Sequence, residues 1–357
     1  MSLKDESIRI MEEYTGMKLD YKVPGLAEKS QIADLVLELE AVERTRDFSK
    51  LIECAELLGL EVSKCRELPD ALLLYPKDFG QLFVVWNLDS KAHPFVLSYQ
   101  HAGTDDVDEL GIQYMLSCNY KALVVNGLHA YTSDKPSELE PTRKITDGCN
   151  SGSTWGIIFL DEVINKAFKL KQFGLVSIHG HRAEESFKLR YSNCVPEHQF
   201  NTSVKNFPFL LCVATALEEE FQKFRFQATS EHDNLMVSGR KLCSTTGKKC
   251  FLSVEGPATD IPIHLVNAGS ITSDKGTCTG RAVHIEHAIN FSSKNLHLLV
   301  AIHNRALKWF RKWDNNFHRY ENIPEDLEDF DSWIHETKKC PAEKDCPFCK
   351  IVTSCCD

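Results

Sequence analysis

Three apolar runs, each of which ends in polar residues, constrain the fold of this chain more than any other feature. Pro94–Tyr99 precedes His101, Asp105 and Asp106; Phe173–Ile178 precedes His179 and His181; and Ala282–Ile285 precedes Glu286. Short apolar runs of this kind are typical of buried strands. In open α/β sheets, ligands collect beyond the carboxyl ends of the strands. A metal hydrolase could therefore be built from these ends, with two histidines and an acid as ligands and a separate carboxylate as base.

The elements around these runs predict an α/β fold. Helical spacing at 31–40 and 48–58 is followed by two strands, 71–75 and 81–86, that form an antiparallel pair. Strands then alternate with helices, which predicts a mixed, largely parallel β-sheet sandwiched between helices. The later elements expected are helices at 107–118, 154–168, 209–224 and 295–313, and strands at 122–126, 175–178, 263–266 and 282–287.

This pattern suggests three regions. We expect an N-terminal helical segment at 1–70 that packs on the main domain, an α/β domain at 71–323, and an acidic, cysteine-rich tail at 324–357. Within the first region, Asp47 is suited to cap the second helix and Gly59 to end it. In the tail, Cys346 and Cys349 have a CxxC spacing, but no second CxxC follows, so a mobile or packed tail is the simpler interpretation.

The composition of the chain limits the classes of partner that we expect. The chain of 357 residues carries a net charge of −10 without a long basic cluster, which argues against nucleic acid as a partner. No run approaches the roughly 18 apolar residues of a membrane span. The polar, acidic N-terminus is unlike a signal peptide, and the 14 cysteines are expected to be free thiols or metal ligands. We therefore expect a cytoplasmic protein with no membrane partner.

Each candidate residue also has a structural explanation. His101 and His179 could be core histidines bonded to backbone, and Asp105 and Asp106 ordinary loop acids; which of the two aspartates points inward depends on the turn at Gly103. Glu286 lies within an apolar strand pattern, where an unpaired buried carboxylate is costly. It is either a general base or an outward-facing residue of an edge strand.

The segment from Arg143 to Asn150 adds polar groups between the first two strand ends. Arg143 could hold a substrate carboxylate through two hydrogen bonds. Asp147 could orient Arg143 or a ligand, and Asn150 could donate to a substrate carbonyl or cap the following helix. Cys149 could act as a thiol nucleophile with a histidine partner. No phosphate-binding loop, GxGxxG turn or HExxH motif occurs, and Thr154 stands where a nucleophile elbow needs serine.

The order of these segments carries a resemblance to a known family. His-Ala-Gly-Thr-Asp-Asp, then Arg…Asp-Gly-Cys-Asn, then Ile-His-Gly, then His-Ile-Glu resembles the zinc-dependent carboxypeptidase superfamily. The pattern looks most like the N-formylglutamate amidohydrolase and poly-γ-glutamate hydrolase branches, and it spans roughly residues 72–304. The resemblance implies a mixed sheet between helices with one Zn²⁺ ion at the strand ends.

The resemblance also implies roles for individual residues. His101, Asp106 and His179 would be the metal ligands, with Asp105 as the other candidate acid. Glu286 would be the general base for a zinc-activated water. Arg143 would fix a substrate carboxylate. Asp147, Asn150 and His181 are the further candidate substrate-binding residues, which the polar segments themselves suggest.

The implied function is hydrolysis of an amide bond in an N-acyl amino acid or a small acidic peptide. The chain departs from the pattern at Thr104, which stands where a carboxypeptidase HxxE motif has its acid, and in its Asp-Gly-Cys-Asn segment. These departures leave an alternative, a catalytically degenerate member of the fold that acts as a binding or regulatory module.

Overall fold

The protein divides into two compact units, which are described separately. The computed structural model describes residues 21–77, 82–101, 108–128, 131–139, 141–149, 151–169, 174–181, 189–192, 234–237, 240–243, 250–254, 282–288 and 295–317, together with 213, 216 and 292. The first unit comprises Met1–His181 with Ile261–Ala268, and the second comprises Arg182–Asp260 with Gly269–Asp357. None of the helices in these described ranges is both long enough and apolar enough to span a membrane.

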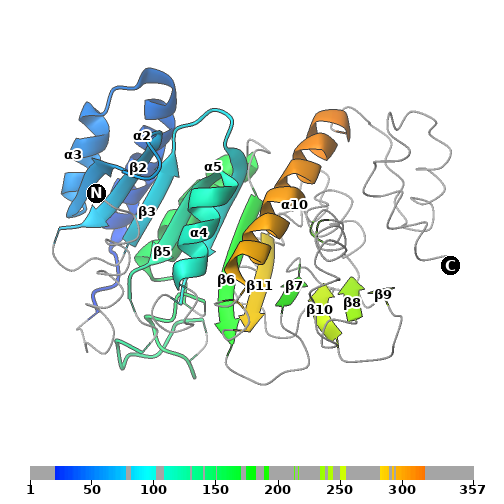
Figure 1. The fold of residues 1–357 in the computed structure, drawn as a ribbon. Coiled ribbons are helices and arrows are strands. Elements are labelled where there is room, and N and C mark those ends of the chain that lie inside the picture. Colours follow the sequence, from blue (N-terminus) through cyan, green and yellow to red (C-terminus); the bar gives the residue numbers. More distant parts are fainter. Residues whose placement is uncertain are drawn as a thin grey trace. The chain divides into compact units, whose positions relative to one another are not determined.

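The first unit is built on six strands in the order β1-β2-β3-β5-β4-β6 (Figure 1). The ladders from β1 to β5 are antiparallel, whereas β4 runs parallel to both β5 and β6. The carboxyl ends of β4, β5 and β6 therefore meet at one edge of the sheet. The strands are β1 (Leu60–Lys64), β2 (Ala71–Pro76), β3 (Leu82–Asn87), β4 (His93–Tyr99), β5 (Tyr120–Asn126) and β6 (Gly174–His181).

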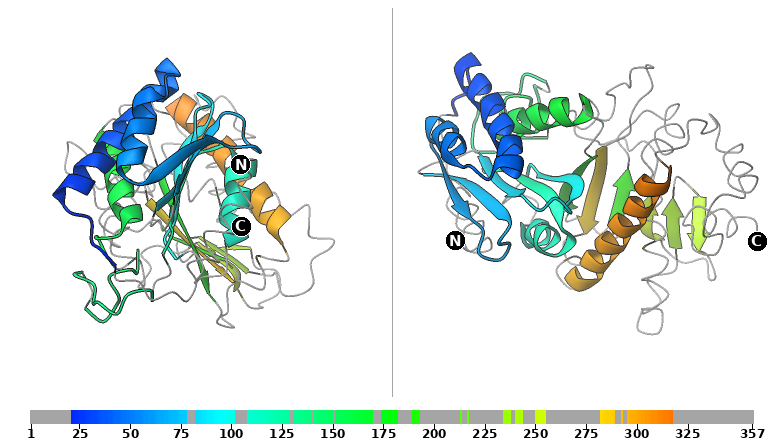
Figure 2. Two further views of the ribbon diagram at one scale, coloured as in Figure 1. Left: turned by 90° about the vertical axis from the view of Figure 1, so that its left-hand side faces the viewer. Right: turned by 90° about the horizontal axis from the view of Figure 1, so that it is seen from above.

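Helices cover both faces of this sheet, which explains why its central strands are buried along their whole length. Every residue of β2, β3 and β5 is buried, as expected for strands that pack on two sides. Figure 2 shows α4 (Asp108–Cys118) on one face and α5 (Trp155–Lys169) on the other, in a layer with α2 (Leu26–Thr45) and α3 (Ser49–Leu57). The α/β class, with a mixed sheet between helices, is confirmed.

Local signals at the helix ends agree with the sequence. The Ser49 backbone N–H donates to Asp47 Oδ1 over 3.0 Å, so Asp47 satisfies one of the free amides at the start of α3. Gly59 has a φ of 69°, a left-handed conformation that glycine adopts without strain, just after α3 ends. β1 follows directly and pairs with β2; the sequence did not predict this strand.

The second unit contains five strands that pair in the order β11-β7-β10-β8-β9 and the long helix α10 (Leu296–Phe317). The predicted strand at 282–287 and helix at 295–313 are confirmed as β11 (Ala282–Ala288) and α10. Four short strands had not been predicted: β7 (Leu189–Ser192), β8 (Asn234–Val237), β9 (Arg240–Cys243) and β10 (Cys250–Val254). The helix expected at 209–224 is described only at Val213 and Ala216, both helical, and the strand expected at 263–266 and the tail from 324 lie outside the described residues.

Candidate metal centre

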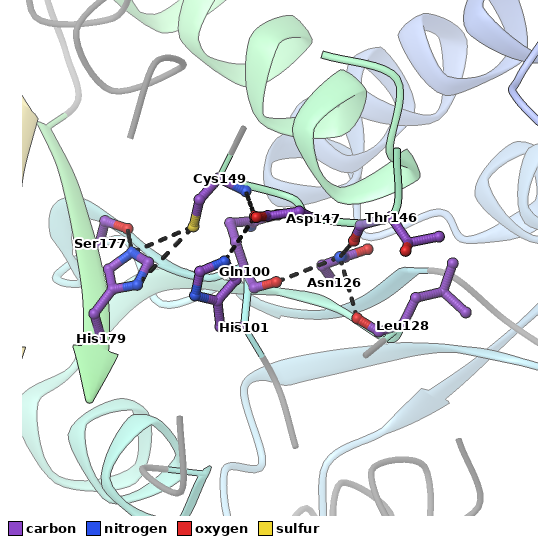
Figure 3. Close-up of polar contacts among 9 residues, drawn as sticks. All are labelled: Gln100, His101, Asn126, Leu128, Thr146, Asp147, Cys149, Ser177 and His179. Carbon is purple, nitrogen blue, oxygen red and sulfur yellow. Dashed lines mark hydrogen bonds and ion pairs between the residues drawn. The ribbon is translucent and has the colours of Figure 1, made fainter. Parts of the chain in front are cut away.

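Two histidines from neighbouring parallel strands meet at the carboxyl edge of the first unit's sheet. Ser98 of β4 is in register with Ser177 of β6. His179 follows Ser177 by two residues, which places it on the same face of β6, and His101 follows the end of β4. Their rings approach with centroids 5.1 Å apart at 89° (Figure 3). The topology of the sheet thus brings together two of the predicted metal ligands.

Asp147 supports one of these histidines from a loop. Its side chain is only 6% exposed, and its Oδ1 atom accepts a hydrogen bond from His101 Nε2 over 2.8 Å. Because a carboxylate only accepts, Nε2 of His101 carries a proton, and in the neutral form of the ring Nδ1 keeps its lone pair. Metal-binding histidines typically have such a carboxylate on the ring nitrogen that does not bind the metal.

Cys149 completes the cluster. Its Sγ atom lies 3.6 Å from His179 Nε2 and 3.9 Å from His179 Nδ1, and Ser177 Oγ is 3.0 Å from the same Nε2. Burial of the thiol alone would raise its pKa. The positive charge and hydrogen bonds of His101 and His179 outweigh burial, so the pKa of Cys149 falls below its usual value.

A buried amide network fixes the loop that carries Asp147 and Cys149. Asn126, at the end of β5, donates through Nδ2 to the backbone oxygens of Gln100 (3.3 Å), Thr146 (3.3 Å) and Leu128 (3.4 Å). Gly148 packs so closely on this network that a Cβ atom there would lie 2.9 Å from Gln100 Oε1 and 3.0 Å from Asn126 Nδ2. The loop is therefore held against the ends of two strands of the sheet.

A second set of contacts secures the outer part of the same loop. The Tyr21 hydroxyl donates to the Ser153 backbone oxygen over 2.5 Å, and Lys135 Nζ donates to the Tyr21 backbone oxygen over 3.3 Å. The Glu138 carboxylate accepts from the hydroxyls of Ser151, at 3.1 and 3.2 Å, and Ser153, at 2.8 Å. The segment that precedes α2 is thus tied directly to the loop that forms the site.

Three side chains converge whose donor atoms are of the types that bind transition metals. His101, Cys149 and His179 each offer one donor atom, and these atoms lie within 4.8 Å of one another. Imidazole nitrogen and thiolate sulfur are donors that zinc prefers, whereas Mg²⁺ and Ca²⁺ favour oxygen. Since a protein zinc ion commonly has two or more such donors, the cluster fits this ion.

The structure brings together His101, Asp147 and His179 among the residues predicted from sequence. The sequence suggested that Asp147 orients either Arg143 or a metal ligand. In the structure, Asp147 contacts the side chain of His101, a predicted ligand, and the backbone N–H of Cys149. The Arg143 side chain is exposed, four residues before Asp147 on the same loop.

The other predicted residues are placed only in part. Asp105, Asp106 and Asn150 lie outside the described residues. His181 is the last residue of β6, and the structure describes its backbone but not its side chain. Glu286 lies on β11 of the second unit; it is half-buried, with Oε1 3.1 Å from His284 Nε2. Cys149 was considered only as a nucleophile, and its position two residues after Asp147 was the available signal for a ligand role.

Comparisons with known proteins give little further guidance. No family model matches the chain, and no curated protein matches it. Among solved structures, a metallo-carboxypeptidase from Burkholderia cenocepacia is 9% identical, with a TM-score of 0.34 over 81% of this chain and 70% of the other. A metallo-carboxypeptidase from Pseudomonas aeruginosa in complex with (2-guanidinoethylmercapto)succinic acid is 13% identical, with a TM-score of 0.29 over 75% and 69%.

Proposed function

We propose that this protein is a zinc-dependent hydrolase that cleaves an amide bond of an N-acyl amino acid or a small acidic peptide. The observation that carries the proposal is the convergence of His101 and His179, with the Asp147 carboxylate behind His101. Two imidazoles at the carboxyl edge of a sheet, one of them oriented by a carboxylate, match the arrangement that catalytic zinc sites need.

The chain's own residues would hold the ion and orient the substrate. His101 would bind through Nδ1, since Nε2 donates to Asp147, and His179 would supply the second nitrogen. A bound zinc ion supplies Lewis-acid chemistry, polarising a carbonyl and lowering the pKa of water to about 7. Asp147 keeps the His101 ring in one orientation and one tautomer.

Two further roles rest on the resemblance to the zinc-dependent carboxypeptidase superfamily. Arg143 would bind the substrate carboxylate; its exposed side chain on the Asp147 loop is compatible with this role. Glu286 would accept a proton from the attacking water and return it to the leaving amine. Both assignments make a carboxylate-bearing amide the expected substrate class.

Metal content and hydrolysis, measured on the same samples, test the proposal. We expect the purified full chain to bind zinc and to hydrolyse members of a panel of N-acyl amino acids and acidic dipeptides. His101→Ala should lose zinc and activity together, whereas Glu286→Gln should keep zinc and lose activity. His297→Ala, at an exposed position on α10, is the control. Protein that binds no zinc, with hydrolysis unaltered in His101→Ala, would refute the proposal.

A second candidate function uses the same cluster without a metal. Cys149 Sγ lies 3.6 Å from His179 Nε2 and has a lowered pKa, which are features of a thiol nucleophile beside its base. Activity that survives a chelator but is abolished by alkylation of Cys149 would favour this thiol hydrolase. Activity that is lost in chelator and restored by zinc would exclude it. Zinc binding without hydrolysis of any substrate would instead favour the catalytically degenerate binding module.

A further inference from the structure

For the third protein ligand, the described residues offer a candidate that the resemblance does not name. The resemblance gives this position to an acid of the first loop, Asp106. Among the described residues, the group that meets the two histidines is a thiol. We infer that Cys149 Sγ is a zinc ligand and that the ion is held by His101, Cys149 and His179; this inference rests on the proposed function.

The distance between the Cys149 thiol and the His179 ring fits two ligands of one tetrahedral ion. With Zn–N of about 2.05 Å and Zn–S of about 2.3 Å, a nitrogen and a sulfur on one tetrahedral zinc are about 3.6 Å apart. Cys149 Sγ lies 3.6 Å from Nε2 and 3.9 Å from Nδ1 of His179. Either nitrogen is therefore within about 0.3 Å of the distance that shared coordination requires. If His179 Nε2 donates to Ser177 Oγ, Nδ1 is the nitrogen left for the ion.

Asp147, the loop residue that orients the His101 ring, also orients Cys149. Asp147 Oδ1 accepts from His101 Nε2 over 2.8 Å and from the Cys149 backbone N–H over 3.1 Å. One carboxylate oxygen thus orients two of the three donors. Gly148 lies between the two loop residues, and the close approach of its backbone to Gln100 fixes the direction in which Cys149 leaves the loop.

Burial and charge also favour coordination. Cys149 is 1% exposed, and a buried thiolate is costly unless a positive charge lies beside it. The two imidazoles lie beside this thiol, and a zinc ion would supply the positive charge that a buried thiolate needs. A thiolate ligand selects zinc over magnesium, calcium or manganese, and three protein ligands leave a fourth position open for a substrate or water.

X-ray absorption at the zinc edge measures the ligands directly and does not depend on activity. The full chain is loaded with one equivalent of zinc, as wild type, as Cys149→Ser and as Cys118→Ser, which changes another buried cysteine. We expect one sulfur at about 2.3 Å in wild type and in Cys118→Ser, beside nitrogen or oxygen at about 2.0–2.1 Å. In Cys149→Ser the sulfur shell should disappear, and zinc affinity should fall more than 10-fold.

Each remaining result has a definite meaning. Zinc bound by nitrogen and oxygen alone in wild type would overturn the inference and leave the proposed hydrolase intact, with an acid as third ligand. A sulfur shell that persists in Cys149→Ser would also overturn it, because the sulfur would then come from another cysteine, such as those of the tail. Failure of wild type to bind zinc at all would overturn the proposed function together with the inference.

Discussion

The shared oxygen of Asp147 makes a graded prediction about zinc affinity. A hydrogen bond to a charged group contributes about 1.5–3 kcal/mol, roughly twice the value of a neutral bond. Asp147→Asn keeps an acceptor for His101 and for the Cys149 amide but loses the charge, so it should cost about 1 kcal/mol, or about 5-fold in zinc affinity. Asp147→Ala removes the bond to His101 and leaves the buried Cys149 N–H unpaired, which should cost at least about 2–3 kcal/mol, or about 30–150-fold.

Competition with a chromophoric chelator measures these affinities on the full chain, and circular dichroism establishes that each variant is folded. Asp134→Asn is the matched control, because the Asp134 side chain is 72% exposed on the same loop. Its zinc affinity should equal that of wild type. If Asp147→Asn and Asp147→Ala bind zinc as tightly as wild type, or if the asparagine variant is as weak as the alanine variant, the reasoning from the shared carboxylate is wrong.

Three further predictions concern the scaffold. Gly148→Ala should weaken zinc binding and destabilise the protein by about 1–3 kcal/mol, because its Cβ would overlap the buried amides, whereas Gly152→Ala, where the nearest atom is 3.5 Å away, should change neither quantity. Glu43→Ala should lower the free energy of unfolding by up to about 3–5 kcal/mol in urea titrations. It removes the carboxylate that lies 2.6 Å from the buried Lys121 ammonium and leaves that charge a hydrogen bond to the Asn87 backbone oxygen (2.8 Å) but no acidic partner at this distance. Unchanged stability would contradict this reasoning. Burial lowers the pKa of His303 well below its usual value, so the unfolded state binds the proton at a higher pH than the folded state does. The free energy of unfolding should therefore fall as the pH drops below about 6.5. His303→Gln should flatten this dependence on pH, and an unchanged slope would contradict the reasoning.

The sequence predicted those parts of the site that follow from strand periodicity. His101 and His179 could be recognised because each closes an apolar run, and parallel strands deliver their carboxyl ends to one edge of the sheet. The mixed sheet followed from the same runs. The short strand at Leu60–Lys64 was missed because it alternates apolar and polar residues over only five positions at the edge of the sheet, where a preceding helix gives the stronger signal.

The position of Cys149 beside the two histidines could not be predicted in the same way. Its position depends on a loop that is held at the edge of the sheet by a hydrogen bond from the Asn126 amide and by the close packing of Gly148. Contacts between residues so far apart in the chain produce no periodic pattern in the sequence. The second unit posed a similar problem, since strands of four or five residues, such as β7 (Leu189–Ser192), give little periodicity to detect.

The contact between Tyr21 and the loop that carries Asp147 and Cys149 has a consequence for the evolution of this chain. The Tyr21 hydroxyl and the Lys135 ammonium join the residues ahead of the first described helix to the segment that carries the ligands. A deletion or exchange of that leading segment should therefore disturb the loop that carries Asp147 and Cys149, more than a hundred residues away in the chain. We expect the leading segment and this loop to be inherited together, and grafting either one into a similar fold should fail unless Tyr21 is kept with the loop.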